Sequence, residues 1–173
     1  KDLKASKSLK ENNVDLIICD HHKPGELLPE AFSILNPKQY DCEYPFKELC
    51  GCGIGFKLIQ CYLKKYNLEI ELNSFFQLAA VATAADVVPL INENRLLVFF
   101  GLKAINKTPI APFQILFEKL NVQNNFNLGD LIFKIAPRIN AAGRLDSASM
   151  ATKFLISNSN DAERNLLKIE SIN

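Results

Sequence analysis

Hydrophobic residues change their spacing along this chain: short apolar runs occupy the first third, and helical periods follow. Residues 14–19 (VDLIIC) form one such run, and residues 32–35 (FSIL) form another. A short, mostly apolar run is typical of a strand that is buried on both faces of a parallel sheet. The preceding residues 1–11 are polar and basic, which predicts a solvent-facing helix that ends at Asn12 and Asn13. This order of elements predicts an α/β sheet.

Beyond residue 50 the apolar positions recur about every 3.6 residues, which predicts helices. The first helix ends at Asn67, and residues 75–83 predict a buried helix capped by Asn73 or Ser74. Further helices are predicted over 93–105, 113–120, 128–135, 147–156 and a last segment with a capping box at Asn160 and Glu163. The predicted fold class is therefore α/β, with part of a doubly wound, mainly parallel sheet in the first third and a mainly helical section after it.

Composition narrows the function classes. The chain has 173 residues, of which 48% are hydrophobic, and a net charge of +1. This size fits one ordinary globular domain, and the charge gives no strong basic field for a nucleic acid or a membrane surface. The lysines at positions 1, 4, 7 and 10 are interpreted as a solvated helix face, with nucleic-acid contact as the alternative. The longest apolar stretches, such as 96–100, are too short to span a bilayer, so we expect a cytoplasmic protein without a membrane partner.

Sulfur-containing residues and glycines add three expectations. Met150 is the only methionine, so we expect the chain to be a piece of a longer protein. The five cysteines form no CxxC pair and are expected to be reduced and packed as small hydrophobic residues; a metal edge at Cys50-Gly-Cys52 is the alternative. Residues 51–55 (GCGIG) suggest a dinucleotide loop, but Phe56 stands where the third glycine is required. We therefore expect close helix packing or a tight loop there.

The segment Asp20-His21-His22 follows the first predicted strand directly. In open α/β sheets ligands bind at the carboxyl ends of strands, and this segment supplies two imidazoles and a carboxylate within one turn. The alternative is a surface turn with solvated histidines. A second candidate is Asp86, whose neighbours are hydrophobic on both sides, so its charge needs a cation or strong donors. A pair of His21 and Asp86 would suit Mn²⁺ or Mg²⁺ better than zinc, although backbone amides alone could satisfy Asp86.

A third candidate is the segment 137–144 (PRINAAGR), in which small residues separate two arginines and an amide. Guanidinium groups bind phosphate oxygens in a bidentate manner, and small residues allow a ligand to approach the backbone. Arg138 and Arg144 would not share one face of a regular helix, so we expect a bent or loop presentation. The alternative is a small-residue helix contact with solvated arginines.

Four motifs resemble, in the same order, those of RecJ-type single-stranded-DNA exonucleases of the DHH phosphoesterase superfamily: ICDHHKPGE, NPKQYDCEYPFKELCGCGIGFKL, ATAADVVPLINENR and APRINAAGRLDSAS. The DHH motif alone indicates only the superfamily, which includes family II inorganic pyrophosphatases and oligoribonucleases. The motifs PFKELCGCGIGFKL and PRINAAGRLD make the resemblance specific to RecJ. It implies a DHH-type sheet and hydrolysis of single-stranded DNA from a 5′ end, in recombination and repair.

The resemblance also implies roles for individual residues. His21 and Asp86 would bind Mn²⁺ or Mg²⁺ in a two-metal site, His22 would contact the scissile phosphate, and Asp20 would support the site. The phosphate- or DNA-contacting motif would contain Arg138, Asn140 and Arg144. The implied partners are single-stranded DNA and repair or recombination proteins, and the oligomeric state stays open.

In one respect the chain departs from the family, which places an Asp-rich motif and a further metal-binding Asp before the DHH motif. Nothing before Asp20 matches them. We therefore expect an incomplete metal site that is inactive alone, with residues 1–146 as a partial DHH catalytic domain and residues 147–173 as a helical segment leading toward an absent DHH-associated domain. Two other functions stay open: a phosphoesterase acting on short oligonucleotides or a small phosphate compound, and a degenerate non-catalytic scaffold.

Overall fold

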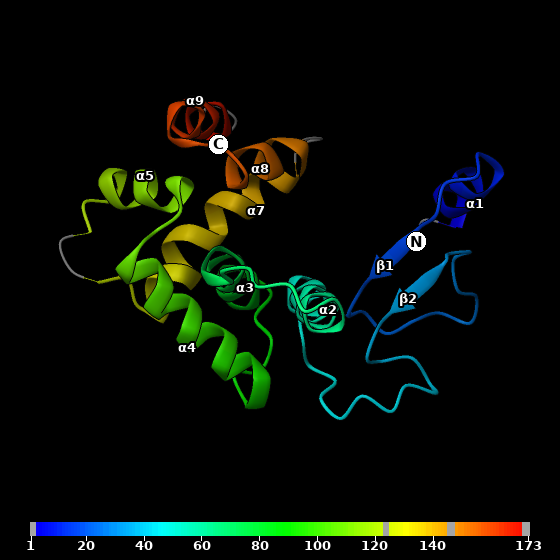
Figure 1. The fold of residues 1–173 in the computed structure, drawn as a ribbon. Helices are drawn as coiled ribbons and strands as arrows, with labels where there is room; N and C mark the ends of the chain where they lie inside the picture. The colour runs from blue at the N-terminus through cyan, green and yellow to red at the C-terminus, as the bar shows by residue number, and fades with distance from the viewer. Residues whose placement is uncertain (1–2, 123–124, 145–147, 171–173) are drawn as a thin grey trace.

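The computed structural model describes residues 3–122, 125–144 and 148–170. For residues 141–144 it describes the backbone but not the side chains. Its elements are, in chain order, α1 (Leu3–Glu11), β1 (Ile17–Cys19), β2 (Ser33–Leu35), α2 (Gly51–Lys65), α3 (Asn73–Ala85), α4 (Asn92–Lys107), α5 (Ala111–Lys119), α6 (Leu128–Asp130), the π-helix η1 (Leu131–Ile135), α7 (Ala136–Arg144), α8 (Ala148–Leu155) and α9 (Ser159–Glu170). The strands lie in the first third and helices follow, which confirms the predicted α/β class (Figure 1).

Strands β1 and β2 pair in parallel, with Ile18 opposite Ile34 at the centre. Both strands begin later than the sequence predicted, and the expected burial of the first strand on both faces is wrong. Ile17 is 50% exposed, and Ile18 is only partly buried. The physical reason is that α2 packs against β1, while the described residues provide no comparable layer on the other face.

Helix α2 lies between the two strands and the later helices that begin with α3 (Figure 1). It begins after Cys50, whose thiol accepts a hydrogen bond from the Gly53 amide at 3.3 Å. It ends before Asn67, which adopts the left-handed conformation with a φ of 51°. The glycine-rich segment is therefore the start of a helix, in agreement with the expected close packing. Gly53 leaves room for Leu49 and Leu97, which lie near the position that a side chain would occupy.

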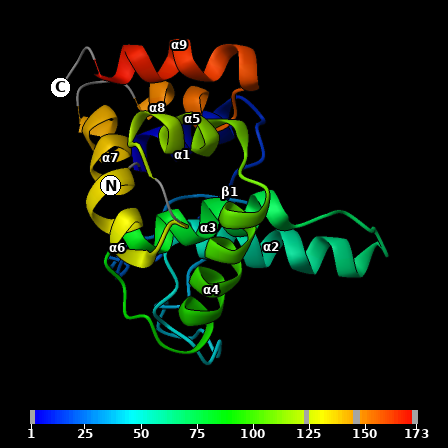
Figure 2. The ribbon, with the colours of Figure 1, turned by 90° about the vertical axis from the view of Figure 1, so that its left-hand side faces the viewer.

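The main hydrophobic core joins helices α3, α4, α5, α8 and α9 with η1, around residues such as Phe113, Ile135 and Phe154. Figure 2 shows α5, α8 and α9 at one end of this group and α4 at the other. A smaller core around Leu49, Ile54 and Phe56 connects α2 to α3 and α4. No helix within the described residues is long and apolar enough to cross a bilayer.

The segment around Pro137 forms the regular helix α7, so the expected bent or loop presentation is wrong. The chain enters α7 through the π-helix η1, where the Ala136 amide donates to the carbonyl of Leu131. A π-turn skips one backbone position, which is compatible with the missing N–H of Pro137.

Two predicted caps and the expected packing of the cysteines also need correction. Helix α3 already includes Asn73 and has no side-chain cap. At α9 the Asn158 side chain accepts hydrogen bonds at 3.1 Å from the amides of Asn160 and Asp161, so the cap lies two residues before the predicted one. Neighbouring asparagines have equal capping ability, and only packing selects among them.

The expected packing of the cysteines is correct for only one of them. All five cysteines are free, but only Cys50 is buried, whereas Cys52 and Cys61 are exposed.

Candidate metal centre

The turn after β1 is organised by the Asp20 carboxylate. The Asp20 amide donates to the carbonyl of Leu35 at 3.0 Å, which ties the turn to the end of β2. One oxygen of the carboxylate, Oδ1, accepts hydrogen bonds from the amides of His21 at 2.8 Å and His22 at 3.3 Å. An aspartate that bonds to the following amides stabilises a tight turn. This turn places both imidazole rings at the carboxyl end of β1, with ring centroids 4.4 Å apart.

Asp20 also orients the ring of His22. The Nδ1 atom of His22 lies 2.7 Å from Asp20 Oδ1. A carboxylate in this position keeps the proton on Nδ1 and directs Nε2 toward a ligand. Partial burial raises the pKa of the Asp20 carboxyl, but hydrogen bonds from the His22 ring and from both backbone amides lower it more, and the net pKa lies below its ordinary value. The Asp20 carboxyl therefore stays ionised as an acceptor.

Asn36 holds the same turn from the other strand. Its side-chain Nδ2 donates to the carbonyl of His22 at 2.8 Å, and its Oδ1 accepts from the amide of Lys38 at 2.9 Å. Asn36 is 5% exposed, so these hydrogen bonds are largely shielded from water. In the sequence, Asn36 stands between the predicted strand at 32–35 and Pro37. The pattern Asn-Pro after a strand was the one available signal, and it does not reveal which carbonyl the amide would bind.

Asp86 comes from the end of α3 and meets His21 across the site. The Nε2 atom of His21 lies 3.1 Å from Oδ2 of Asp86, and the two side chains are 15% and 40% exposed. The core fixes this position, because α3 buries residues along most of its length. The structure thus brings together the two residues that sequence reasoning had paired for a metal.

The donors at this place fit a divalent cation. One ligand atom each from Asp20, His21 and His22 lies within 4.8 Å of the other two, in the part of the chain that the structure describes. With Asp86 beside His21, the site offers carboxylate oxygens and imidazole nitrogens. Mn²⁺ accepts both kinds of donor, whereas Mg²⁺ prefers oxygen.

These residues line a cavity of about 650 Å³, which we call the site cavity. The start of α2 forms one wall, and a side-chain carbon at Gly51 would lie 3.9 Å from the His21 ring. Thr152 and Leu155 of α8 form part of another wall, which the sequence did not indicate. Cys52 also lines the cavity; it is exposed, but the protein atoms crowded around its thiol raise the pKa to about 11, which keeps the thiol protonated.

The third predicted motif reaches the site cavity only in part. Asn140 lines the cavity. Arg138 donates instead to the carbonyl of Lys134 at 2.6 Å, in the preceding π-helix η1. The side chain of Arg144 lies outside the described residues. Of this group, the structure therefore places Asn140 at the candidate metal centre.

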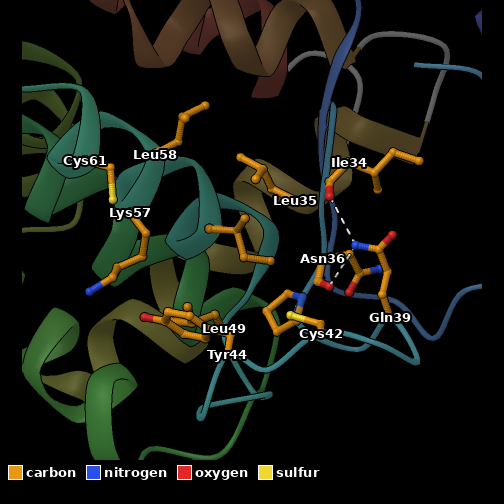
Figure 3. Close-up of a pocket in the computed structure, with 12 residues that line it drawn as sticks. Ile34, Leu35, Asn36, Gln39, Cys42, Tyr44, Leu49, Lys57, Leu58 and Cys61 are labelled. Atoms are coloured by element: carbon orange, nitrogen blue, oxygen red, sulfur yellow. Dashed lines mark hydrogen bonds between the residues drawn. The ribbon is translucent and has the colours of Figure 1, made fainter. Parts of the chain in front are cut away.

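A separate groove of about 320 Å³ lies between β2, the loop after it and α2 (Figure 3). Its walls are mainly apolar, and Gln39 crosses one end with hydrogen bonds to the carbonyls of Ile34 at 3.1 Å and Asn36 at 3.3 Å. The groove contains none of the paired histidines and carboxylates, which lie in the site cavity.

Comparison with known proteins shows which proteins this chain resembles. Residues 1–84 match the DHH family, N-terminal domain. The single-stranded-DNA-specific exonuclease RecJ of Bacillus subtilis is 39% identical over 97% of this chain, and that of Haemophilus influenzae is 35% identical over 95%. The chain spans 21% and 31% of the lengths of these two relatives.

Solved structures of RecJ also resemble this chain. A crystal structure of exonuclease RecJ bound to manganese superposes with a TM-score of 0.81 at 30% identity, covering 99% of this chain and 43% of that one. RecJ from Thermus thermophilus in complex with Mg²⁺ superposes with a TM-score of 0.74 at 30% identity, covering 92% of this chain and 24% of that one.

Proposed function

This chain belongs to the DHH family, and from that premise we propose that it is part of the catalytic core of a metal-dependent exonuclease that degrades single-stranded DNA from the 5′ end. The observation that carries the proposal is the 3.1 Å approach of His21 Nε2 to Asp86 Oδ2 beside the turn of Asp20 and His22. Residues distant in sequence meet at the carboxyl end of a parallel strand, where α/β proteins bind ligands. The relatives named for this activity support the choice of substrate.

Each residue of the site has a proposed role. His21 and Asp86 hold the divalent ion, which supplies charge neutralisation at the phosphate and a more acidic water when bound. His22 contacts the scissile phosphate, while Asp20 orients the His22 ring through Nδ1. Asn140 contacts the DNA from α7. Arg138 is proposed to contact phosphate with guanidinium N–H groups that do not bond to the carbonyl of Lys134. Arg144 is proposed to contact phosphate from the end of the helix.

The extent of the chain limits what it does alone. Because it spans about one fifth of the Bacillus relative, the activity is proposed for the whole protein that contains it. The isolated chain is expected to bind Mn²⁺ weakly and to leave 5′-labelled single-stranded DNA intact. We retain residues 1–146 as the partial catalytic domain and residues 147–173 as the segment toward a further domain, although α8 and α9 share the main core with α3.

The proposal is tested in the whole protein with His21→Ala and Asp86→Ala. Each substitution should lower kcat on 5′-labelled single-stranded DNA by roughly a thousandfold or more, since a metal ligand is lost, and should weaken Mn²⁺ binding measured by titration calorimetry. Asp41→Ala removes an exposed carboxylate from the loop after β2 and is the matched control. Near-normal rates for either site variant would show that its ligand assignment is wrong.

The two other functions give different results in the same assay. Faster hydrolysis of dinucleotides than of long single-stranded DNA would indicate a phosphoesterase for short substrates. A whole protein that binds DNA without hydrolysing it in Mn²⁺ or Mg²⁺ would indicate a non-catalytic scaffold.

A further inference from the structure

Val87 has a backbone conformation that its side chain disfavours. Its φ is 54°, in the left-handed region. The other non-glycine residues with positive φ among the described residues are all asparagines, at positions 13, 67, 92 and 121. Asparagine tolerates this region, whereas a β-branched residue is a genuine outlier there. Val87 also follows the C-cap of α3, a position that usually holds glycine.

The neighbours of Val87 hold this conformation from both sides. Before it, the amide of Asp86 donates to the carbonyl of Ala82 at 3.0 Å and completes the last turn of α3. After it, the fully buried side chain of Asn94 donates to the carbonyl of Pro89 at 2.9 Å. A strained residue persists only where its surroundings fix it in this way, and such residues gather at functional sites.

The strain does not serve the core, because the Val87 residue is 82% exposed. The side chain forms one wall of a shallow groove of about 400 Å³, which we call the Val87 groove. Ile132 and Pro137 supply its other aliphatic walls, and Asn140 stands at its edge. No charged side chain lines the Val87 groove, so it suits an uncharged, flat group.

The Val87 groove adjoins the candidate metal centre. Ala85 and Asn140 line both the groove and the site cavity, so they form the border between the two hollows. Val87 is also the residue next to Asp86, which approaches His21. A nucleotide whose phosphate lies at the metal centre would therefore bring its sugar and base to this border.

We propose that the Val87 groove binds the nucleobase of the nucleotide whose phosphate lies at the metal centre, an inference that rests on the proposed function. The face of Val87 packs against the base, and the Asn140 amide, which is both donor and acceptor, bonds to its edge or its sugar. Every base has a flat apolar face, so this contact is largely independent of DNA sequence. The left-handed conformation of Val87 places an apolar side chain beside the metal centre. A glycine at this position would provide no such side chain.

The test uses Val87→Gly and Val87→Asn in the whole protein, because both residues tolerate a positive φ. Relief of strain should raise the Tm of Val87→Gly by about 2–4 °C. The lost apolar contact should raise KM for 5′-labelled single-stranded DNA about five- to tenfold in both variants. A purely structural residue would give the rise in Tm without the rise in KM. Asn121→Gly, at another left-handed position after α5, is the control and should leave KM unchanged.

The same variants are then assayed on DNA that carries one abasic residue at the first, second or third position from the 5′ end. At one of these positions the wild type and Val87→Gly should become equal in kcat/KM, since the missing base is the group that Val87 contacts. The inference would be overturned if Val87→Gly lost the same factor in kcat/KM on intact DNA and on all three abasic substrates. It would also be overturned if KM on intact DNA were unchanged. Either result would leave the proposed function in place. A wild-type protein that hydrolyses none of the DNA substrates would overturn the proposed function itself.

Discussion

The chain before residue 46 and the helices after it are stabilised in different ways. Among the described residues, the buried hydrophobic residues begin only at Phe46. The earlier region holds its turns with polar contacts, such as those of Asp20 and Asn36. The later region packs apolar side chains, and Phe113, for example, is fully buried in the main core.

The candidate metal centre spans these two regions. Asp20, His21 and His22 belong to the polar region, whereas Asp86 is fixed by the packed helix α3. Hydrogen bonds to partly exposed groups each contribute little, while buried apolar side chains contribute several times more. The comparison indicates that global stability and site geometry depend on different residues, and the substitutions below separate the two.

The largest effect is expected in the main core. Phe154 is 1% exposed, so Phe154→Ala should lower the free energy of unfolding by about 3–5 kcal/mol. Ile34→Ala, in the partly exposed strand β2, should lower it by only about 1 kcal/mol. Urea unfolding of both variants measures the difference. Equal losses would contradict the division into two differently stabilised regions.

The contact between α3 and α4 gives the next effect. A side chain at Gly101 would overlap the Cβ of Ala80 and the carbonyl oxygen of Phe76. Gly101→Ala should therefore cost about 1–3 kcal/mol by forcing the helices apart. The matched control is Gly55→Ala in α2, where nothing lies within 4 Å of the new carbon. It should stabilise the protein by about 0.5–1 kcal/mol, and a loss there would contradict the described packing of α2.

In the polar region the largest expected effect falls on the metal. Asn36→Ala removes the hydrogen bond to the carbonyl of His22 and should weaken Mn²⁺ binding about tenfold, as measured by titration calorimetry. Because Asn36 is buried, the free energy of unfolding should also fall by about 1–2 kcal/mol. Gln39→Ala is the control, because its side chain bonds to the carbonyls of Ile34 and Asn36 and not to that of His22. If both variants weaken Mn²⁺ binding equally, Asn36 has no special role in holding the turn.

The smallest effect is a dependence on pH. Because the pKa of folded Asp20 is lowered, its stabilising contribution is fully present above the unfolded value of about 3.9 and is lost as the pH falls through the lowered folded value. Asp20→Asn should therefore be less stable than the wild type at neutral pH, and the difference should shrink below about pH 4. Urea midpoints between pH 7 and pH 2.5 measure this. A constant difference would show that the carboxylate charge does not support the turn.

Sequence reasoning succeeded where local chemistry determines the outcome. It predicted a strand at 32–35, of which 33–35 is observed, the end of α2 at Asn67 and the histidines at a strand terminus. These features depend on apolar runs and left-handed asparagines, which act within a few residues. It failed where packing decides, as for the exposure of β1 and the helical form of the Pro137 segment. The role of Asn36 was also missed, since its partner carbonyl lies in another turn.

By itself, the sequence determined the α/β class, the order of the elements and which side chains are able to bind a metal. The tertiary structure was needed to show that His21 meets Asp86, that Asn140 lines the site cavity while Arg138 bonds to a carbonyl of η1, and that Val87 is held in a left-handed conformation beside them. The reason is physical: residue type sets what a side chain can do chemically, but its distance to a partner far along the chain depends on the packing of the helices that carry both.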